Sequence, residues 1–420
     1  MTKPHAKPHG GFRFARSIAL ALLIGWMPLS AGAQNVERLI RDLSSPKVAV
    51  RSDAAEALAH ARSKRALPAL IRAMGDPVAS VRGQAVRAVA ATADRTSVPL
   101  LLAALRDKSS YRRLGAATVL GILADPRTLD PLAAATKDAN ASVRAAATEA
   151  LGNLDDPRAA AALRPRLTDP APRVRLKAAT ALGRLRDTQS STSLLPLLRD
   201  RDRAVQSAAA VALAQIGDRR VVPALIQIAE HPTPGDTFGV RFYAAYALGA
   251  LGDRRAVPVL IQGLNDRDPF LRSAAAGALG QMRVRSAVPP LLKALQDRHY
   301  LVRWTAAQAL GNLRDRRAVP FLIRRLKDPN EDIREQSAKA LGKIGDRAAV
   351  PALIGVFKDE DEAIPKAAAL ALGRIGDRRA VPALRGLLKH ENATVRQAAA
   401  DALRMLGSSG AAVLPRHPSP

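Results

Sequence analysis

Apolar residues recur along this chain at the spacing of α-helices, in pairs of short segments that are joined by polar residues. In residues 315–345, the apolar positions of 319–326 fall on one helix face, and those of 333–341 fall on one face of a second helix. Asp315 is suited to cap the first helix, the sequence KDPNED breaks it, and Gly345 is suited to end the second helix. The pattern therefore predicts a pair of helices.

This pair of segments returns about twelve times. The turn GDRRAVP occurs at residues 252–258 and again at 376–382, and its aspartate position recurs every 31 residues, with one step of 35. An apolar column in the second segment has the same period: Leu58, Val89, Leu120, Leu151, Leu182, Leu213, Leu248, Leu279, Leu310, Leu341, Leu372 and Leu403. Because neither helix can bury its apolar face alone, neighbouring pairs are expected to stack into one continuous all-α array.

Three motifs of the repeat resemble the HEAT-repeat superfamily, specifically its short 31-residue type found in phycobilisome-lyase-like proteins. They are D-x-x-A-V-P-x-L-I at the turn and first helix, D-x-x-x-x-V-R at the joint between the two helices, and A-A-x-A-L-G in the second helix. The motifs extend over about residues 35–407. The resemblance implies a right-handed α-solenoid of about twelve repeats at residues 34–407, with variable second-helix positions on its concave surface.

A basic column at the start of the second helices is part of this resemblance. It holds Arg51, Arg82, Arg113, Arg144, Arg175, Arg241, Arg272, Arg303, Arg334 and Arg396, with Gln206 and Pro365 as exceptions. Most of these arginines have an aspartate six residues earlier, namely Asp76, Asp107, Asp138, Asp169, Asp266, Asp297 and Asp328. In the resembled family such residues form a ladder of Asp–Arg pairs between neighbouring repeats. We therefore expect this column to be structural; contact with a ligand is the alternative.

The first 33 residues have the pattern of a secretory signal peptide. Four basic and no acidic residues precede an apolar run at 18–29, which is shorter than the ~20 residues of a membrane span, and Ala31 and Ala33 resemble a cleavage site. We expect a periplasmic or secreted protein cleaved near Ala33; an uncleaved anchor and a buried helix are the alternatives. Cleavage would lower the net charge from +28 to about +24. The tail, residues 408–420, is expected to be disordered.

The positive charge favours acidic partners or anionic surfaces. Part of it lies in the turns between repeats, at Arg219, Arg220, Arg254, Arg255, Arg316, Arg317, Arg378 and Arg379. Stacking would align these residues, called the basic ridge below, along one edge of the solenoid. The ridge is either solvated charge without a ligand or an electrostatic strip for an anionic partner. For an exported protein, nucleic acid is the less natural partner.

The repeats differ most in the unit of 35 residues. Its segment 229–249 carries four extra residues and four aromatic ones, and the inserted HPTPGD loop is placed to cover one end of a groove. Two variable second-helix positions in this and the next two repeats are Phe242, Tyr246, Ser273, Gly277, Trp304 and Gln308. We predict that these six residues form a partner-binding groove with an aromatic wall and a floor of small residues. The alternative is that the rings only fill space beside the insertion.

The sequence offers little for catalysis or metal binding. It has no cysteine, which excludes disulfides, Cys–metal sites and a Cys nucleophile. It also lacks G-x-S-x-G, H-E-x-x-H and a Walker-type glycine loop. Deoxyhypusine hydroxylase, a relative in architecture, holds two irons with several His-Glu pairs, whereas only His390-Glu391 matches here. We predict no catalytic residue, no metal and no cofactor.

Three functional hypotheses follow. The leading one is an exported, non-catalytic scaffold that binds a protein or peptide, preferably an acidic one, in the concave groove of its middle repeats. The first alternative is an electrostatic binder of a polyanion or anionic surface through the basic ridge. The second alternative is a lyase-like protein that handles a chromophore or cofactor, as the resemblance would allow.

Overall fold

The computed structural model describes residues 29–231 and 239–407. Within these ranges all regular structure is helical, with 24 α-helices, α2 to α25, joined by short 3₁₀ turns. The chain divides into two compact units, residues 1–154 and 155–420, which are described separately. Most of the predicted signal peptide, the inserted loop from residue 232 to 238 with Phe238, and the predicted tail lie outside the described residues.

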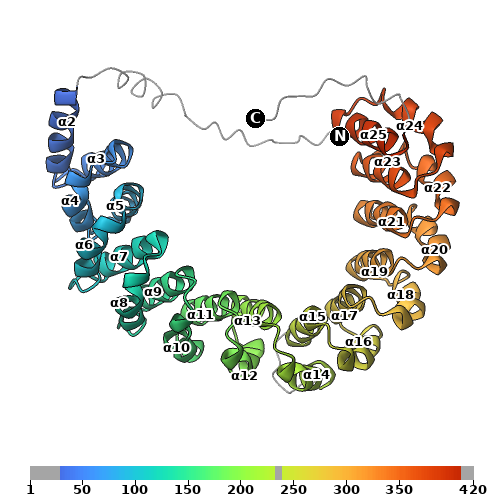
Figure 1. Cartoon of the computed structure of the whole chain (residues 1–420), viewed down its shortest axis with the longest axis horizontal. Helices are drawn as coiled ribbons and strands as arrows, with labels where there is room; N and C mark the ends of the chain where they lie inside the picture. The colour runs from blue at the N-terminus through green and yellow to red at the C-terminus, as the bar shows by residue number, and fades with distance from the viewer. Residues whose placement is uncertain (1–28, 232–238, 408–420) are drawn as a thin grey trace, which may run out of the picture. The chain divides into compact units, whose positions relative to one another are not determined.

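Unit 1 alternates first and second helices after an initial helix α2 (Leu29–Asp42), and the two kinds of helix form two rows (Figure 1). The first helices are α4 (Leu67–Ala73), α6 (Val98–Ala104) and α8 (Leu129–Ala135). The second helices are α3 (Val48–Ala61), α5 (Ala79–Thr92), α7 (Ser110–Leu123) and α9 (Ala141–Asn153). The second helices are about twice as long as the first and contribute most of the buried side chains.

Unit 2 continues the same alternation through eight repeats (Figure 1). Its first helices are α10 (Ala160–Leu163), α12 (Ser191–Leu194), α14 (Val222–Glu230), α16 (Val257–Gly263), α18 (Val288–Ala294), α20 (Val319–Arg325), α22 (Val350–Gly355) and α24 (Val381–Leu387). Its second helices are α11 (Pro172–Arg184), α13 (Arg203–Ile216), α15 (Val240–Leu251), α17 (Pro269–Gln281), α19 (Tyr300–Leu313), α21 (Glu331–Ile344), α23 (Ala363–Ile375) and α25 (Ala393–Met405). The two-row stack confirms the predicted α-solenoid.

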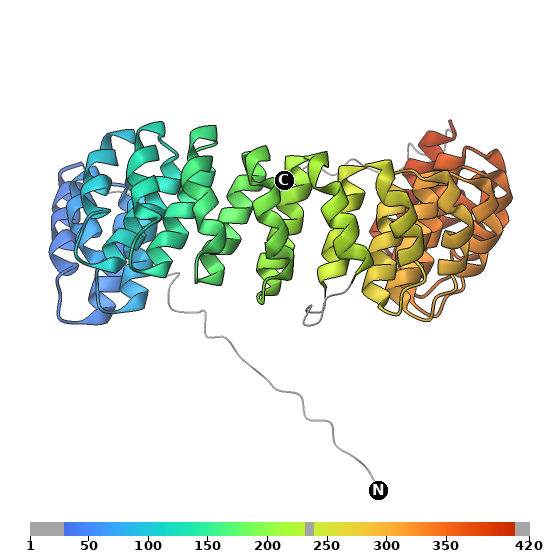
Figure 2. The ribbon, with the colours of Figure 1, turned by 90° about the horizontal axis from the view of Figure 1, so that it is seen from below.

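Each repeat has two edges, because its helices run antiparallel (Figure 2). The joint between the first and second helix lies at one edge, and the turn to the next repeat lies at the other. Asp315 caps this turn by accepting a hydrogen bond from the backbone N–H of Arg317, and a 3₁₀ turn at Arg316–Ala318 precedes α20. The repeated proline therefore stands at the start of the first helix, as Pro320 does in α20. The backbone therefore changes from 3₁₀ to α geometry directly before the proline.

The core consists of the predicted leucine column and small residues that allow close helix contact. Every member of that column is at most 1% exposed. The glycine that follows it packs against an alanine of the next second helix: a Cβ built on Gly280 would lie 2.5 Å from Cα and Cβ of Ala309. Gly311 meets Ala340 in the same way. The A-L-G motif thus sets how closely neighbouring repeats stack, since a methyl group here would force the helices apart.

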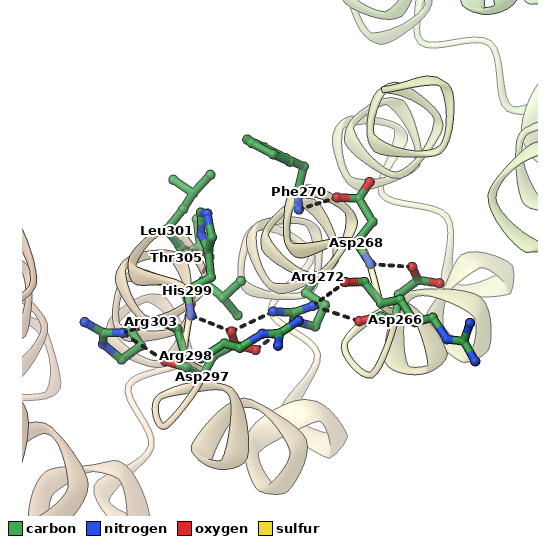
Figure 3. A network of polar contacts seen from close by, with 12 residues as sticks. Asp266, Asp268, Phe270, Arg272, Asp297, Arg298, His299, Leu301, Arg303 and Thr305 are labelled. Carbon is green, nitrogen blue, oxygen red and sulfur yellow. Dashed lines mark hydrogen bonds and ion pairs between the residues drawn. The ribbon is translucent and has the colours of Figure 1, made fainter. Parts of the chain in front are cut away.

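A ladder of arginines and aspartates ties the joints together, as the resemblance implied (Figure 3). Arg272 donates from Nε and Nη2 to both carboxylate oxygens of Asp297, 25 residues later, at 2.7 Å each, and its Nη1 donates to the backbone carbonyl of Asp266. The same cross-repeat pair is formed by Arg51–Asp76, Arg113–Asp138, Arg175–Asp200, Arg241–Asp266, Arg303–Asp328 and Arg334–Asp359. Each such arginine binds its own joint and the next repeat at once.

The exceptions in the ladder keep part of this pattern. Gln206 replaces the arginine in one repeat and still donates to the carbonyl of Asp200. Asp107 pairs with Arg112 of its own repeat, and the guanidinium of Arg82 lies 3.8 Å from the ring centroid of Tyr111. Gln206 and Arg82 therefore keep the carbonyl contact within their own repeats, whereas Pro365 has no side-chain donor for it.

Candidate functional site

Helices α15, α17 and α19 enclose a groove of about 490 Å³ within unit 2. Phe242 and Tyr246 of α15 line one side of it. The ring of Phe242 meets that of Tyr243 edge to face, with centroids 5.2 Å apart, so that this wall is backed by a second ring. Tyr246 is 44% exposed, which leaves its ring accessible. Phe242 therefore packs against a second ring, whereas Tyr246 is open to solvent.

The floor of the groove is formed by the small residues of α17. Ser273, Ala274, Gly277 and Ala278 line it, and Ser273 is buried. A Cβ built on Gly277 would meet no other atom within 4 Å, in contrast to Gly280 three residues later. Gly277 therefore faces the open groove, and its missing side chain adds depth to the groove instead of helix contact.

The opposite wall comes from α19, where residues at i, i+4, i+7 and i+11 share a helix face. These are Leu301, Thr305, Gln308 and Asn312. The structure thus brings five of the six predicted groove residues together, namely Phe242, Tyr246, Ser273, Gly277 and Gln308. Trp304 is half-buried on α19 and does not line the groove. That these residues contact a partner stays a prediction.

The groove has a neutral lining that combines apolar surface with amide groups. None of its lining residues is charged, although the chain as a whole carries a net charge of +28. Gln281, Gln308 and Asn312 each offer one acceptor oxygen and an amide donor. Asn312 already accepts a hydrogen bond from Nζ of Lys343 through Oδ1. The site is suited to apolar anchors and to groups that need both a donor and an acceptor.

Six lining residues were missed by the sequence argument: Ala274, Ala278, Gln281, Leu301, Thr305 and Asn312. They stand outside the two variable columns that were compared between repeats. A search for residues at i, i+4, i+7 and i+11 around Gln308 would have found three of them. Gln281 is the last residue of α17 and therefore stands near the turn edge.

The turn edge separates the arginines of the basic ridge into two kinds. The inner arginines, Arg220, Arg255, Arg317 and Arg379, each pair with the aspartate of their own turn at 2.7–2.9 Å. The hydrogen bonds from Arg255 hold the pKa of Asp253 down at about 2. Arg255 also donates to the backbone carbonyl of Arg219 in the preceding turn. The inner arginines are therefore part of the structure of the turn.

The outer arginines stand one residue earlier, directly after the turn aspartate or its substitute. In unit 2 they are Arg219, Arg254, Arg285, Arg316, Arg347 and Arg378, in six consecutive repeats, and all are exposed. Arg316 makes a long contact of 3.7 Å to Asp346, with 82% of its side chain exposed. The guanidinium groups of Arg219, Arg254 and Arg378 have no hydrogen bond or ion pair within the described ranges. The sequence prediction omitted Arg285 and Arg347, because they lack an adjacent inner arginine.

Residues 29–231 and 239–407 contain neither a metal-binding cluster nor a membrane-spanning helix. No group of three or more His, Asp or Glu side chains there is arranged to hold a metal ion. In the same ranges no helix combines the length and apolar character needed to span a bilayer.

The fold and the groove define the chain as an α-solenoid of two-helix repeats with a neutral cleft on its second helices. The chain belongs to the HEAT-repeat family: the family model for HEAT repeats matches residues 36–121, 99–175, 162–237, 235–300, 288–370 and 355–415. The phycobilisome-lyase-like subtype stays an expectation. No curated protein sequence matches this chain.

Solved structures of karyopherins share the fold. The karyopherin Kap121p, bound to the extreme C-terminus of the protein phosphatase Cdc14p, is 15% identical with a TM-score of 0.57, and the match covers 93% of this chain and 52% of that one. Importin beta is 17% identical with a TM-score of 0.59, and the match covers 89% and 61%. The chain spans about half the length of Kap121p. At these identities the likeness concerns the fold.

Proposed function

We propose that this protein is a non-catalytic scaffold that binds an extended segment of a partner protein in the groove between α15, α17 and α19. The observation that carries the proposal is the neutral lining, in which an aromatic wall faces amide side chains across an open glycine floor. Aromatic rings in partly exposed clefts are common anchors for partners. Side-chain amides offer the same donor and acceptor pair as a peptide group, and therefore suit an exposed peptide backbone.

The karyopherin comparison supports a terminal or extended segment as the kind of partner. Kap121p is bound to the extreme C-terminus of Cdc14p, which shows that a solenoid of this fold holds a chain end. For the present chain this remains an analogy of fold. The neutral groove changes the expected partner: the contact itself does not require an acidic segment, and the positive charge elsewhere would only speed the encounter.

Blocking the groove floor is the sharpest test. Gly277→Phe places a ring in the groove without meeting any protein atom near its Cβ, so the fold should be retained. The matched control is Gly83→Phe in α5, where a Cβ also meets nothing within 4 Å. Peptides selected from a random phage library on the wild-type protein should bind the control and lose binding to Gly277→Phe. Equal binding by both variants would contradict the groove.

The wall and the salt dependence test the same contact independently. Phe242→Ala should weaken binding of the selected peptides by over ~1 kcal/mol, which calorimetry can measure. Binding should persist at about 0.5 M salt, since an uncharged lining has little to lose from screening. Loss of binding at that salt concentration would instead implicate charged residues.

Export is proposed separately, from the basic and apolar pattern of residues 1–33. Helix α2 begins at Leu29, so cleavage after Ala33 would remove its first five residues. N-terminal sequencing of the protein recovered from the periplasm or medium should begin at Gln34. Recovery of an intact N-terminus from the cytoplasm would contradict this part of the proposal.

A further inference from the structure

The turn edge of unit 2 carries a row of charges that the groove does not use. The outer arginines repeat in six consecutive turns, from Arg219 to Arg378. Neighbouring helices pack about 8–10 Å apart, so the row places one guanidinium about every 10 Å over roughly 50 Å. Where an inner arginine is present, it already occupies the turn aspartate, as Arg255 does with Asp253. Arg219, Arg254 and Arg378 are thereby left without an ion pair within the described residues, whereas Arg316 keeps its long contact to Asp346.

Backbone strain at the same edge provides a second observation. The residue that ends the second helix is in the left-handed region, and glycine fills this place at Gly217, Gly252, Gly345 and Gly376. In the other repeats of unit 2 this place is taken by Asp155, Arg186, Arg283 and Arg314, of which Arg283 and Arg314, with φ of 53° and 52°, precede an outer arginine. A residue with a Cβ is disfavoured there. Both side chains are exposed beside an outer arginine, so strained positions add further positive charge to this edge.

We propose that the outer arginines, with Arg283 and Arg314, form a binding surface for a linear polyanion, such as a sulfated polysaccharide. Guanidinium groups bind sulfate, carboxylate and phosphate oxygens through paired N–H donors. A row of charges at regular spacing matches an extended polymer better than a compact anion. The proposal is independent of the groove, whose lining contains none of these residues.

The surroundings of the row distinguish this partner from two others. Single-stranded nucleic acid is usually held by base stacking on aromatic rings, and the described turns from 217 to 220 and from 252 to 255 contain none. Membrane-surface helices insert large apolar side chains. The large apolar residues that are exposed in the described part of unit 2 are Val211, Tyr246, Tyr300 and Met405, and none stands in these turns. The turn edge is therefore suited to recognise a linear polymer through its charges alone.

The test uses fluorescent heparin as the probe and the full chain as the protein. Eight contacts, from the six outer arginines with Arg283 and Arg314, predict a slope of about −6 to −7 for log K against log salt concentration. The triple variant Arg219→Ser, Arg254→Ser, Arg378→Ser removes three outer arginines and leaves every inner pair intact. It should reduce the slope to about −4 and weaken binding at least tenfold at low salt.

The control removes three charges from the joint edge of the same unit: Arg201→Ser, Arg267→Ser, Arg298→Ser. These side chains are exposed, and the control should bind heparin within about threefold of the wild type. Equal loss in both triple variants would show that net charge alone attracts the polymer, and would overturn the proposal. Gly277→Phe should leave heparin binding unchanged, which separates this surface from the groove.

Two further measurements address the strain and the polymer. Arg283→Gly with Arg314→Gly should raise the melting temperature and yet weaken heparin binding; unchanged binding would remove these two residues from the surface.

Linear polyphosphate should compete with heparin, because the row offers charge without a pocket for a sugar ring. Failure of that competition would contradict recognition by charge. Vesicles of phosphatidylserine that bind as tightly as heparin, and lose binding in the first triple variant, would replace the polymer by a membrane surface.

Discussion

Aspartate and arginine form pairs at both the joint edge and the turn edge, but the two kinds of pair have different roles. At the joint edge, Arg272 reaches Asp297 of the next repeat, and both side chains are at most 14% exposed. At the turn edge, Arg255 reaches Asp253 of its own turn, and 56% of the arginine side chain is exposed. The first kind of pair crosses between repeats and is protected from water. The second kind completes a local turn.

The difference shows that sequence separation determines what an Asp–Arg pair contributes. A pair 25 residues apart holds two repeats in register, and its energy depends on low solvent exposure. A pair two residues apart stabilises a cap and gains little from an exposed guanidinium. The joint edge is therefore the part of the repeat on which stability depends, whereas the turn edge can carry extra charge with little structural consequence. Four predictions test this contrast.

Acidification should have the largest effect on stability, because it protonates the paired aspartates of all repeats at once. The hydrogen bond from Arg113 holds the pKa of Asp138 below its usual value, and Arg255 lowers that of Asp253 to about 2. A carboxylate whose pKa is lower in the folded state stabilises the fold above its unfolded pKa of about 3.9, and this stabilisation is lost as the pH falls toward the folded value.

Thermal melts followed by circular dichroism should therefore be constant from pH 8 to about 5 and decline steeply between about pH 4 and 2. The arginines stay charged throughout, so repulsion between them adds to the loss. A decline centred near pH 6.5 would point to histidine instead and contradict the role given to the aspartates.

Breaking one pair at the joint edge should have the next largest effect. Arg272→Ala leaves the carboxylate of Asp297 largely buried without its guanidinium, which should lower the free energy of unfolding by about 3 kcal/mol. Arg396→Ala is the matched control: Arg396 donates to the carbonyls of His390 and Glu391, as Arg272 does in its own joint, but pairs with no aspartate within residues 29–231 and 239–407. Its loss should be about 1 kcal/mol. Equal losses in urea unfolding would show that the carbonyl contacts carry the stability.

The ladder also shows what the sequence could and could not predict. Helix pairs, their caps and the Asp–Arg columns follow from a 31-residue period, because each depends on residues close in the chain. Asp200 and Asp359 were missed as members, because the arginine six residues later is replaced by Gln206 and Pro365 in their repeats. Their partners come from the preceding repeat. The ion pair between Asp107 and Arg112 depends on side-chain geometry, and the 31-residue period does not predict it.

The groove could be predicted in part, because the 31-residue period also shows which positions differ between repeats. Comparing two variable columns identified Phe242, Tyr246 and Gly277, because departures from a repeat show up in an alignment of the units. Which helix face lines the opposite wall depends on how α19 is rotated against α17. That rotation brings Leu301 and Thr305 into the groove and leaves Trp304 beside it.

Removing a cap at the turn edge should have a smaller effect than breaking a joint pair. Asp218 accepts a hydrogen bond from the backbone N–H of Arg220 and pairs with its guanidinium. Asp218→Ala should lower the free energy of unfolding by about 1 kcal/mol through loss of the cap. Arg220→Ala should cost less, since its side chain is 74% exposed. If Asp218→Ala destabilised the protein as much as Arg272→Ala, the contrast between the two edges would be wrong.

The smallest expected effect has the opposite sign. Arg314 ends α19 with φ of 52°, a conformation in which its Cβ is crowded and glycine is favoured. Arg314→Gly should therefore raise the free energy of unfolding by about 1 kcal/mol, measured by urea unfolding. The reverse exchange, Gly345→Arg at φ of 76°, should lower it by a similar amount. If both changes left stability unaltered, arginine at this place would cost no stability. The left-handed backbone would then give no reason to think that the arginine is kept for its charge. If Arg314→Gly is more stable and binds heparin less well, the arginine is kept for its charge.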